Sequence, residues 1–421
     1  MTSLLEWLAY VERLHPRKWD LGLDRVYTVA EQLGLIEHRG IVFLVAGTNG
    51  KGSTCEFIER LCLAKGLTVG KSTSPHLLAF NERIQVNGEP VTDIEIVDAF
   101  AAIESSRAEI SLSYFEFSVL ASLFVFKKRD VDALVLEIGL GGRLDAMNIV
   151  NRDVTVITQI ALDHQAWLGD TREEIATEKA AIMRIGKPCV IADRDPPVSL
   201  LQHAAELNIE ARYIGNDFDF IDDTVWVAGR RFSWIASLSL PKESAAAAVQ
   251  AVISAGISLD PSEVRLVLSN TTLPGRMQWM KGEPDLLLDV AHNPAAAAYL
   301  RDYIADYLSR VSSRPTVHAI VGMYADKDCI EVLRLLSDVV DYWHLTDLLE
   351  ERAASANQLA GYLKLALEDR CQVVTYDKMH NAFNNAVRHS AIEDLIVVFG
   401  SFPVVAGVLQ LASDRISKEC S

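Results

Sequence analysis

The stretch AGTNGKGST (46–54) decides the fold, because it joins an apolar run to a helical segment through a loop rich in glycine. The run IVFLVAG (41–47) has the composition of a buried parallel strand, and STCEFIERLCLAKG (53–66) is typical of a helix. Glycines let backbone N–H groups turn inward as a nest for anions, the helix N-terminus attracts negative charge, and Lys51 adds a mobile cation. The sequence therefore predicts a phosphate-binding loop.

The loop departs from the common phosphate-loop pattern GxxxxGK[ST], which would require glycine at Val45 and a hydroxyl residue at Gly52. A tight strand-to-helix turn with an exposed lysine is the alternative interpretation. Three glycines and one lysine at a predicted strand–helix junction favour the phosphate loop.

The strand–helix alternation continues along the chain and predicts a doubly wound α/β sheet of parallel strands with helices on both faces. Residues 212–240 break this rhythm, because they alternate by twos between turn residues, and we expect them to form a small antiparallel extension. The further predicted strands are 133–139, 154–160 and 188–193, and the predicted helices are 115–129, 172–186, 244–257 and 261–270.

A second domain is expected after LPGRMQWMKGEPD (273–285), which holds two prolines and two glycines and has little periodicity. We place an ATP-binding domain at 1–275, a linker at 276–284 and a smaller domain at 285–421. The strand–helix rhythm restarts in this last part, which predicts a Rossmann-like α/β unit. Its expected strands are 286–291, 317–322, 341–346, 372–376 and 395–401.

Composition excludes several classes of protein. The 421 residues carry 40 Lys and Arg against 57 Asp and Glu, so the net charge of −17 disfavours nucleic acid and anionic membranes as partners. The charged N-terminal segment is typical of neither a secretory signal nor a membrane span. Six cysteines without CxxC spacing fit reduced thiols. We expect a soluble cytoplasmic protein.

Polar side chains follow the predicted strands at the edge where α/β sheets bind ligands. Glu137 ends one strand, and His164 comes just after another. Carboxylate and imidazole beside a phosphate loop fit a Mg²⁺ or Mn²⁺ ion held with a nucleotide. Taken singly, His164 also fits a loop residue, and Ser74 before Pro75 also fits a turn. Lys179 lies in a helical segment with several glutamates, where a surface lysine is the plainer interpretation.

An ordered set of motifs along nearly the whole chain resembles the folylpolyglutamate synthase/dihydrofolate synthase family of the Mur ligase superfamily, and most closely its bacterial bifunctional members. The variant loop GTNGKGST (47–54) belongs to this set. The other matching motifs are LGLDRV (21–26), STSPHL (72–77), NERIQVNG (81–88), SYFEF (113–117), LEIGLGGRLDAMN (136–148), ALDHQAWLG (161–169), EKAAI (178–182), LPGR (273–276), DVAHNP (289–294) and GMYADKD (322–328).

The resemblance implies roles for individual residues. Ser74, Glu137 and His164 are implied as ligands of Mg²⁺, with Ser53 at a second, nucleotide-linked ion, Mn²⁺ as an alternative metal and K⁺ as a further cation. Lys179 is implied to be carbamylated, and Lys51, His292 and Lys179 to be catalytic. The implied ATP contacts are Thr48, Asn49, Gly50, Lys51, Gly52, Ser53, Ser244, Arg276 and Asp289, which would clamp the nucleotide between the two domains.

Three segments are implied to bind dihydropteroate. The rings of Tyr114 and Phe115 offer flat apolar faces for a heteroaromatic ring, and Asp145 is suited to pair with pterin N–H groups. Core filling at a helix start is the alternative for the two rings. The implied residues are Arg13, Leu14, His15, Pro16, Ser113, Tyr114, Phe115, Glu116, Leu144, Asp145 and Ala146.

The activity that the resemblance implies is an ATP-dependent amide ligase, a monomer that joins L-glutamate to dihydropteroate and to reduced folates through an acyl phosphate. The alternatives are a monofunctional folylpolyglutamate synthase, a peptidoglycan Mur ligase, and a nucleotide-switch module without catalysis. The chain also departs from the family pattern at three positions. Ser244 stands where relatives carry asparagine, and Ala325 and Pro403 stand where they carry histidine.

Overall fold

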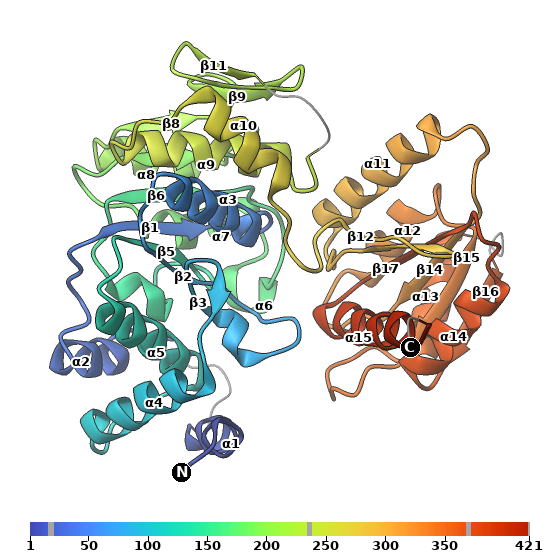
Figure 1. The fold of residues 1–421 in the computed structure, drawn as a ribbon, viewed down its shortest axis with the longest axis horizontal. Helices are drawn as coiled ribbons and strands as arrows, with labels where there is room; N and C mark the ends of the chain where they lie inside the picture. Colours follow the sequence, from blue (N-terminus) through green and yellow to red (C-terminus); the bar gives the residue numbers. More distant parts are fainter. Residues whose placement is uncertain (16–20, 234–237, 368–371, 420–421) are drawn as a thin grey trace. The chain divides into compact units, whose positions relative to one another are not determined.

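The chain forms two units, Met1–Thr271 and Thr272–Ser421, each with its own core and its own large sheet (Figure 1). The computed structural model describes residues 1–15, 21–233, 238–367 and 372–419. Pro16, one of the expected dihydropteroate residues, therefore lies outside the described residues. The segment expected as a linker, 276–284, contains strand β12 (Gln278–Met280) of the second unit.

The first unit is built on an eight-stranded sheet in the order β4-β3-β2-β5-β1-β6-β7-β8. All neighbouring strands pair in parallel except β3 and β4, which are antiparallel. This confirms the predicted α/β fold with a mainly parallel sheet. The strands are β1 (Ile41–Ala46), β2 (Val69–Ser72), β3 (Ile84–Val86), β4 (Glu89–Pro90), β5 (Ala133–Glu137), β6 (Val154–Ile157), β7 (Cys189–Ile191) and β8 (Ala211–Tyr213).

Helices cover both faces of this sheet: Figure 1 shows α3, α9 and α10 on one side and α4 and α5 on the other. Strands β1 and β5 are buried at every position but one, which explains their continuous apolar sequence. The helices are α1 (Leu4–Leu14), α2 (Asp24–Gln32), α3 (Lys51–Ala64), α4 (Asp93–Arg107), α5 (Tyr114–Arg129), α6 (Gln165–Leu168), α7 (Arg172–Ala180), α8 (Val198–Glu206), α9 (Lys242–Ser254) and α10 (Pro261–Asn270), with 3₁₀ turns at Phe80–Arg83 and Ala146–Ile149.

The antiparallel extension is smaller than expected. Residues 211–213 form β8 and extend the large sheet, because β8 pairs in parallel with β7. Only β9 (Phe218–Ile221), β10 (Thr224–Val227) and β11 (Arg230–Ser233) make the separate antiparallel sheet. The prediction of an antiparallel segment is thus confirmed for residues 218–233 and wrong for 212–213.

The second unit is a six-stranded sheet in the order β12-β13-β17-β14-β15-β16, parallel except for β12 at one edge. Each of the five strands expected after residue 285 is present, which confirms the Rossmann-like prediction. The strands after β12 are β13 (Asp285–Leu288), β14 (Val317–Val321), β15 (Tyr342–Thr346), β16 (Gln372–Tyr376) and β17 (Leu395–Phe399), and the helices are α11 (Pro294–Arg310), α12 (Cys329–Leu336), α13 (Ala356–Leu367), α14 (Met379–His389) and α15 (Phe402–Glu419).

Within the described ranges, no helix combines the length and apolar composition needed to cross a bilayer.

A buried cluster of charges joins α3 to the sheet of the first unit. Lys71 on β2 forms ion pairs with Glu56 and Glu59 of α3, and its side chain is only 2% exposed. Burial opposes a charge on Lys71, but the two carboxylates raise its pKa, so it stays protonated. The cluster therefore fixes α3, which starts at the phosphate loop, against the strand that leads toward Ser74.

We expect Lys71→Met to lower the free energy of unfolding by about 3–5 kcal/mol, because it leaves the buried carboxylate of Glu59 without its cation and leaves Glu56 with Arg60 alone. Urea denaturation followed by circular dichroism measures this change. The matched control is Lys128→Met, which removes an exposed lysine paired with Asp98 and should cost at most about 1 kcal/mol. Equal losses in the two variants would contradict the role assigned to the cluster.

Candidate functional site

The phosphate loop is held in a conformation that only glycine accepts at two positions. Gly47 has a φ of 146° and Gly50 a φ of 89°. A Cβ atom on Gly47 would lie 1.8 Å from the Oγ1 atom of Thr158, so the loop backbone packs directly on the segment after β6. Gly50 precedes the first residue of α3, Lys51. The glycine pattern thus reflects close packing as well as the turn itself.

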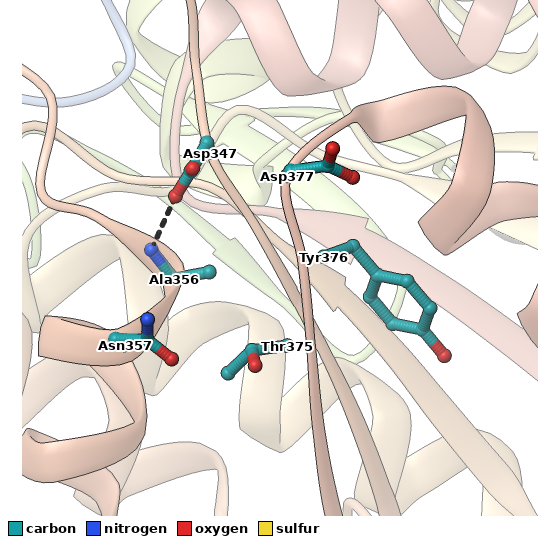
Figure 2. Close-up of a pocket in the computed structure, with 6 residues that line it drawn as sticks. All are labelled: Asp347, Ala356, Asn357, Thr375, Tyr376 and Asp377. Carbon is teal, nitrogen blue, oxygen red and sulfur yellow. Dashed lines mark hydrogen bonds between the residues drawn. The ribbon is translucent and has the colours of Figure 1, made fainter.

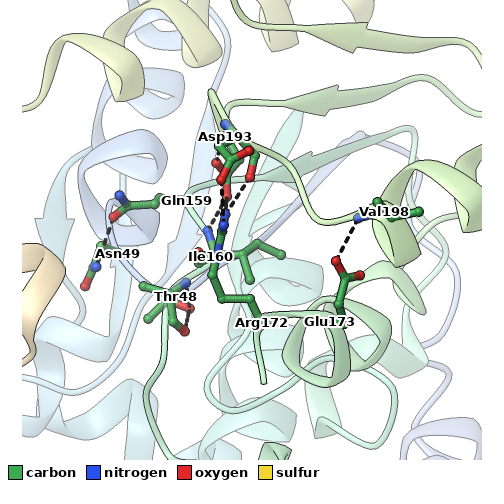
Figure 3. Close-up of polar contacts among 10 residues, drawn as sticks. Thr48, Asn49, Gln159, Ile160, Arg172, Glu173, Asp193 and Val198 are labelled. Carbon is green, nitrogen blue, oxygen red and sulfur yellow. Dashed lines mark hydrogen bonds and ion pairs between the residues drawn. The ribbon is translucent and has the colours of Figure 1, made fainter. Parts of the chain in front are cut away.

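Hydrogen bonds tie the loop to the segment that follows β6 (Figure 3). The backbone N–H of Thr48 donates to the carbonyl of Gln159 at 2.7 Å, and its hydroxyl donates to the carbonyl of Ala161 at 3.0 Å. The amide of Asn49 donates to the Oε1 atom of Gln159 at 3.1 Å. Sequence reasoning missed Gln159, whose only signal was its place at the end of a predicted strand.

Two charged residues, Asp193 and Arg172, form hydrogen bonds with this segment, as Figure 3 also shows. Asp193 accepts a hydrogen bond from the backbone of Ile160 at 2.7 Å, and Arg172 donates to the carbonyl of Ile160 at 2.9 Å. Arg172 and Asp193 are themselves an ion pair at 3.4 Å. The segment that contacts the loop is therefore itself held in place by Asp193 and Arg172.

The structure brings Lys51, Glu137 and Ser74 together at the carboxyl ends of the central strands. Lys51 Nζ lies 3.2 Å from the carbonyl of Thr48 and 3.9 Å from Oε1 of Glu137. The backbone N–H of Ser74 donates to Oε2 of Glu137 at 3.1 Å. Glu137 is 6% exposed, so its carboxylate is held in a shielded place beside a cation. A buried carboxylate next to a phosphate loop is suited to hold a divalent cation.

His164 and Ser53 complete the set of expected metal ligands. His164 precedes the short helix α6 with a φ of 52°, and its ring Nε2 lies 4.0 Å from the carboxylate of Asp163. Ser53 is buried in the first turn of α3. Across the described ranges, no three His, Cys, Asp or Glu side chains gather as a metal site. The expected set contains only two such residues and relies on serine hydroxyls for the rest, so it stays a prediction.

Lys179 is not a surface lysine, so the plainer interpretation of its helix is wrong. It lies in α7 with 4% exposure, and its Nζ donates to the carbonyl of Gly47 at 2.9 Å. Burial and the nearby charge of Lys51 lower the pKa of Lys179 to about 7. Part of the amine is therefore uncharged at neutral pH, unlike an exposed lysine.

Three of the expected dihydropteroate residues have a structural partner in or at the start of their own helix. Ser113 caps α5: Glu116 N donates to its hydroxyl at 3.3 Å, while Ser113 N donates to the Glu116 carboxylate at 2.7 Å. Arg25 also pairs with Glu116 at 3.1 Å. Arg13 donates to the carbonyl of Ala9 in α1 and is exposed.

Phe115 and Asp145, two further members of the expected dihydropteroate set, contact the residues that follow strand β5. Phe115 packs on the backbone at Gly139, where an added Cβ would come within 2.5 Å of its ring. Asp145 accepts N–H donors from Leu140 and Met147 at 2.8 and 2.9 Å, and burial raises its pKa to about 6. The remaining members are half-buried or buried: Leu14, His15, Tyr114, Leu144 and Ala146.

Ser244, one of the expected ATP contacts, lies against the phosphate loop. Its hydroxyl donates to the carbonyl of Gly50 at 3.3 Å from the first turn of α9. The adenine contact expected of this position stays a prediction.

The expected nucleotide residues of the second unit lie around one turn. Asp289 accepts the N–H groups of Met277 and Ala291 at 2.9 and 2.8 Å, and burial raises its pKa. The ring of His292 lies 2.8 Å from the carbonyl of Val290 through its Nδ1 atom. Arg276 stacks on the ring of Phe402 at 4.9 Å.

A small pocket in the second unit was not anticipated from sequence (Figure 2). It lies at the carboxyl ends of β15 and β16, beside the start of α13. Asp347 accepts the N–H of Ala356 at 2.7 Å and so caps the helix. The pocket is lined by Asp347, Ala356, Asn357, Thr375, Tyr376 and Asp377.

Comparison with known proteins assigns both units to Mur ligase domains. Residues 45–219 match the Mur ligase middle domain, and residues 275–402 match the Mur ligase glutamate ligase domain. The chain is 38% identical to the dihydrofolate synthase/folylpolyglutamate synthase of Escherichia coli over 99% of its own length and 97% of the relative. It is 36% identical to the Haemophilus influenzae protein of the same name, with 96% of each chain covered.

Solved structures agree with this comparison. A structure of E. coli FolC in complex with DHPP and ADP superposes with a TM-score of 0.93 at 37% identity and covers 98% of both chains. A bifunctional folylpolyglutamate synthase/dihydrofolate synthase with Mn, AMPPNP and L-glutamate bound superposes with a TM-score of 0.91 at 40% identity, with 98% of both chains covered.

Because Gly47 packs closely on Thr158, a side chain at this position should destabilise the protein. We expect Gly47→Ala to lower the free energy of unfolding by about 3–5 kcal/mol, because it adds a steric clash to an unfavourable φ. Gly66→Ala is the matched control: Gly66 also has a positive φ, of 78°, but nothing lies within 4 Å of an added Cβ, so the loss should be about 1–2 kcal/mol. Urea denaturation of both variants compares them, and similar losses would contradict the packing argument.

Proposed function

The chain belongs to the dihydrofolate synthase/folylpolyglutamate synthase family of Mur ligases, and we propose that it joins L-glutamate to dihydropteroate and to reduced folates. It is an ATP-dependent ligase whose substrates are small molecules. The main support for this proposal is the contact of both Lys51 and the Ser74 backbone with Glu137, beside the glycine-rich phosphate loop. The similarity to bifunctional relatives over both units supports the same conclusion.

The reaction needs an activated carboxylate. A carboxylate oxygen of the acceptor attacks the γ-phosphorus of ATP, the bond to the bridging oxygen breaks, and ADP leaves an acyl phosphate behind. The amine of glutamate then attacks the acyl carbon and expels phosphate. Charge on the transferring phosphoryl oxygens must be stabilised, and Lys51 with the N–H groups of the loop is placed to do this.

The reaction uses ATP with a divalent metal, and we propose Mg²⁺ as that metal, with Mn²⁺ able to replace it and K⁺ as a further cation. Ser74, Glu137 and His164 would hold one ion and Ser53 the other. Hard oxygen donors and one imidazole suit Mg²⁺ and Mn²⁺. When bound, the metal neutralises charge on the phosphate oxygens. The closed pairing of Glu137 with Lys51 and the Ser74 backbone keeps the carboxylate oriented.

The proposal extends to the other expected ATP contacts: Thr48, Asn49, Gly50, Gly52 and Ser244 in the first unit, and Arg276 and Asp289 in the second. His292 would face the transferred phosphate. For dihydropteroate, the proposed contacts are the residues of the expected set, in which Tyr114 and Phe115 would offer ring faces and Asp145 would pair with the pterin N–H groups. We also propose that the protein acts as a monomer in the cytoplasm, where ATP is supplied.

Lys179 is proposed to be carbamylated. Its amine is buried, partly uncharged near neutral pH, and bonded to the loop carbonyl of Gly47. An uncharged amine can attack carbon dioxide, and the carbamate that forms offers oxygen donors in place of an ammonium group. A carbamate there would bring negative charge toward the proposed metal ligands.

An assay of ADP release with and without each substrate tests the proposed function. Wild-type protein with MgATP should release ADP steadily only when dihydropteroate and L-glutamate are both present. Lys51→Ala should lower kcat by about 100- to 1,000-fold, because it removes a cation from the transferring phosphate. Lys65→Ala is the control, since Lys65 lies at the other end of α3 and pairs with Glu263, and it should keep full activity.

The same assay separates the alternatives. Activity with a reduced folate but not with dihydropteroate would indicate a monofunctional folylpolyglutamate synthase. Turnover only with a UDP-linked muropeptide would indicate a peptidoglycan ligase, and ATP binding without any acceptor-dependent ADP release would indicate a switch.

The carbamate has its own pH dependence. Since the amine becomes uncharged as the pH rises through about 7, carbamate should form above that pH and be lost below it. Carbon-13 NMR of the protein in ¹³C-bicarbonate at about pH 8 should show a carbamate signal that is absent in Lys179→Arg, because a guanidinium does not carbamylate. The control Lys65→Arg should retain the signal. A signal that survives in Lys179→Arg would contradict the assignment.

A further inference from the structure

The motif NERIQVNG (81–88) has no role in the function described so far, and its arginine stands out in the structure. Arg83 ends the 3₁₀ turn Phe80–Arg83 and leads into β3. Its carbonyl accepts the N–H of Thr73 at 3.3 Å, so its backbone lies beside the segment that carries Ser74. Arg83 is therefore anchored next to the proposed metal ligands.

The guanidinium of Arg83 is held by aromatic rings. Its Cζ lies 5.5 Å from the ring centroid of Tyr114 and 5.7 Å from that of Phe80. Its Nε donates to Nδ1 of His76 at 2.8 Å. These contacts fix the plane of the guanidinium group. They engage one of its five N–H donors, the one on Nε.

The charge of Arg83 has no carboxylate partner among the described residues, and its two terminal nitrogens have no hydrogen-bond acceptor there. The neighbouring Glu82 is engaged elsewhere, because its oxygens accept the N–H groups of Leu77, Leu78 and Ala79 at 2.6–2.8 Å. Burial lowers the pKa of Arg83 from its ordinary value. A shielded guanidinium without a counter-ion is unfavourable, so this edge is suited to receive an anion.

The surroundings indicate which anion this is. Tyr114 belongs to the proposed dihydropteroate site, and Glu137, beside the phosphate loop, is among the charges that act on Arg83. An anion at this arginine would thus be attached to an aromatic group and would face the γ-phosphate. The planar fork of arginine matches a carboxylate.

We propose that Arg83 binds the carboxylate of dihydropteroate, the group that becomes phosphorylated. This inference rests on the proposed function and adds a residue to it. One carboxylate oxygen would stay on the terminal nitrogens of Arg83. The other would form the bond to the γ-phosphorus as the bond between that phosphorus and the bridging oxygen breaks and ADP departs. Arg83 would act by orienting the nucleophile, since proximity and alignment lower the barrier.

The test measures whether Arg83 and the ligand's carboxylate interact. Binding to wild type and to Arg83→Met is followed by calorimetry in the presence of MgAMPPNP, with dihydropteroate and with the analogue in which hydrogen replaces the carboxylate. Wild type should bind dihydropteroate about 10- to 100-fold more tightly than the analogue, whereas Arg83→Met should bind the two with similar affinity. Arg83→Lys keeps the positive charge but loses the two parallel N–H donors of the guanidinium. Its preference for dihydropteroate over the analogue should be intermediate between those of wild type and Arg83→Met.

The outcomes separate the inference from the function on which it rests. If Arg83→Met retains the wild-type preference for the carboxylate, Arg83 supports the aromatic cluster only and the inference is overturned. If wild type does not bind dihydropteroate, the proposed function fails first. Arg129→Met removes an exposed arginine paired with Glu95 and should leave the preference unchanged. A loss of the preference in this control would overturn the assignment to Arg83.

Discussion

The contact between Gly47 and Thr158 is the constraint on which the site depends. Because no side chain fits there, the backbone after β1 lies directly on the segment after β6. That approach places the carbonyl of Gly47 within reach of Lys179, and the carbonyl of Gly50 within reach of Ser244. It also starts α3 at Lys51, which faces Glu137. The backbone turn at Gly47–Gly50 thus brings together side chains from α3, α7, α9 and β5.

Two buried lysines of the first unit show how their partners decide their chemistry. Lys71 lies against two carboxylates that keep it charged, so it serves as a fixed point between α3 and β2. Lys179 donates to a carbonyl, and the described residues offer it no carboxylate within ion-pair distance. Burial and Lys51 therefore lower its pKa to about 7. Equal burial yields a structural cation in one case and a reactive amine in the other.

The sequence predicted the parallel strands and the phosphate loop because their signals are local: apolar runs, glycines and a lysine in a short span. It missed β2, whose four residues include the buried Lys71, since a charge there hides the strand pattern. It could not foresee that Lys179 is buried, because the glutamates of α7 resemble an exposed helix. Residues such as Gln159, Asp193 and Arg83 act through contacts between distant segments, which no local pattern records. Ser113 and Glu116 form a capping box at the start of α5, and their expected contact with dihydropteroate stays a prediction.

In the reaction proposed for this protein, the loop holds ATP so that a carboxylate oxygen attacks its γ-phosphorus. The most direct measurement follows that oxygen. Dihydropteroate labelled with ¹⁸O in its carboxylate is turned over with MgATP and L-glutamate, and the released phosphate is analysed by mass spectrometry. One labelled oxygen should appear in each phosphate, because the acyl phosphate breaks at its acyl carbon. Phosphate without label, formed at the same rate as the amide, would contradict the account.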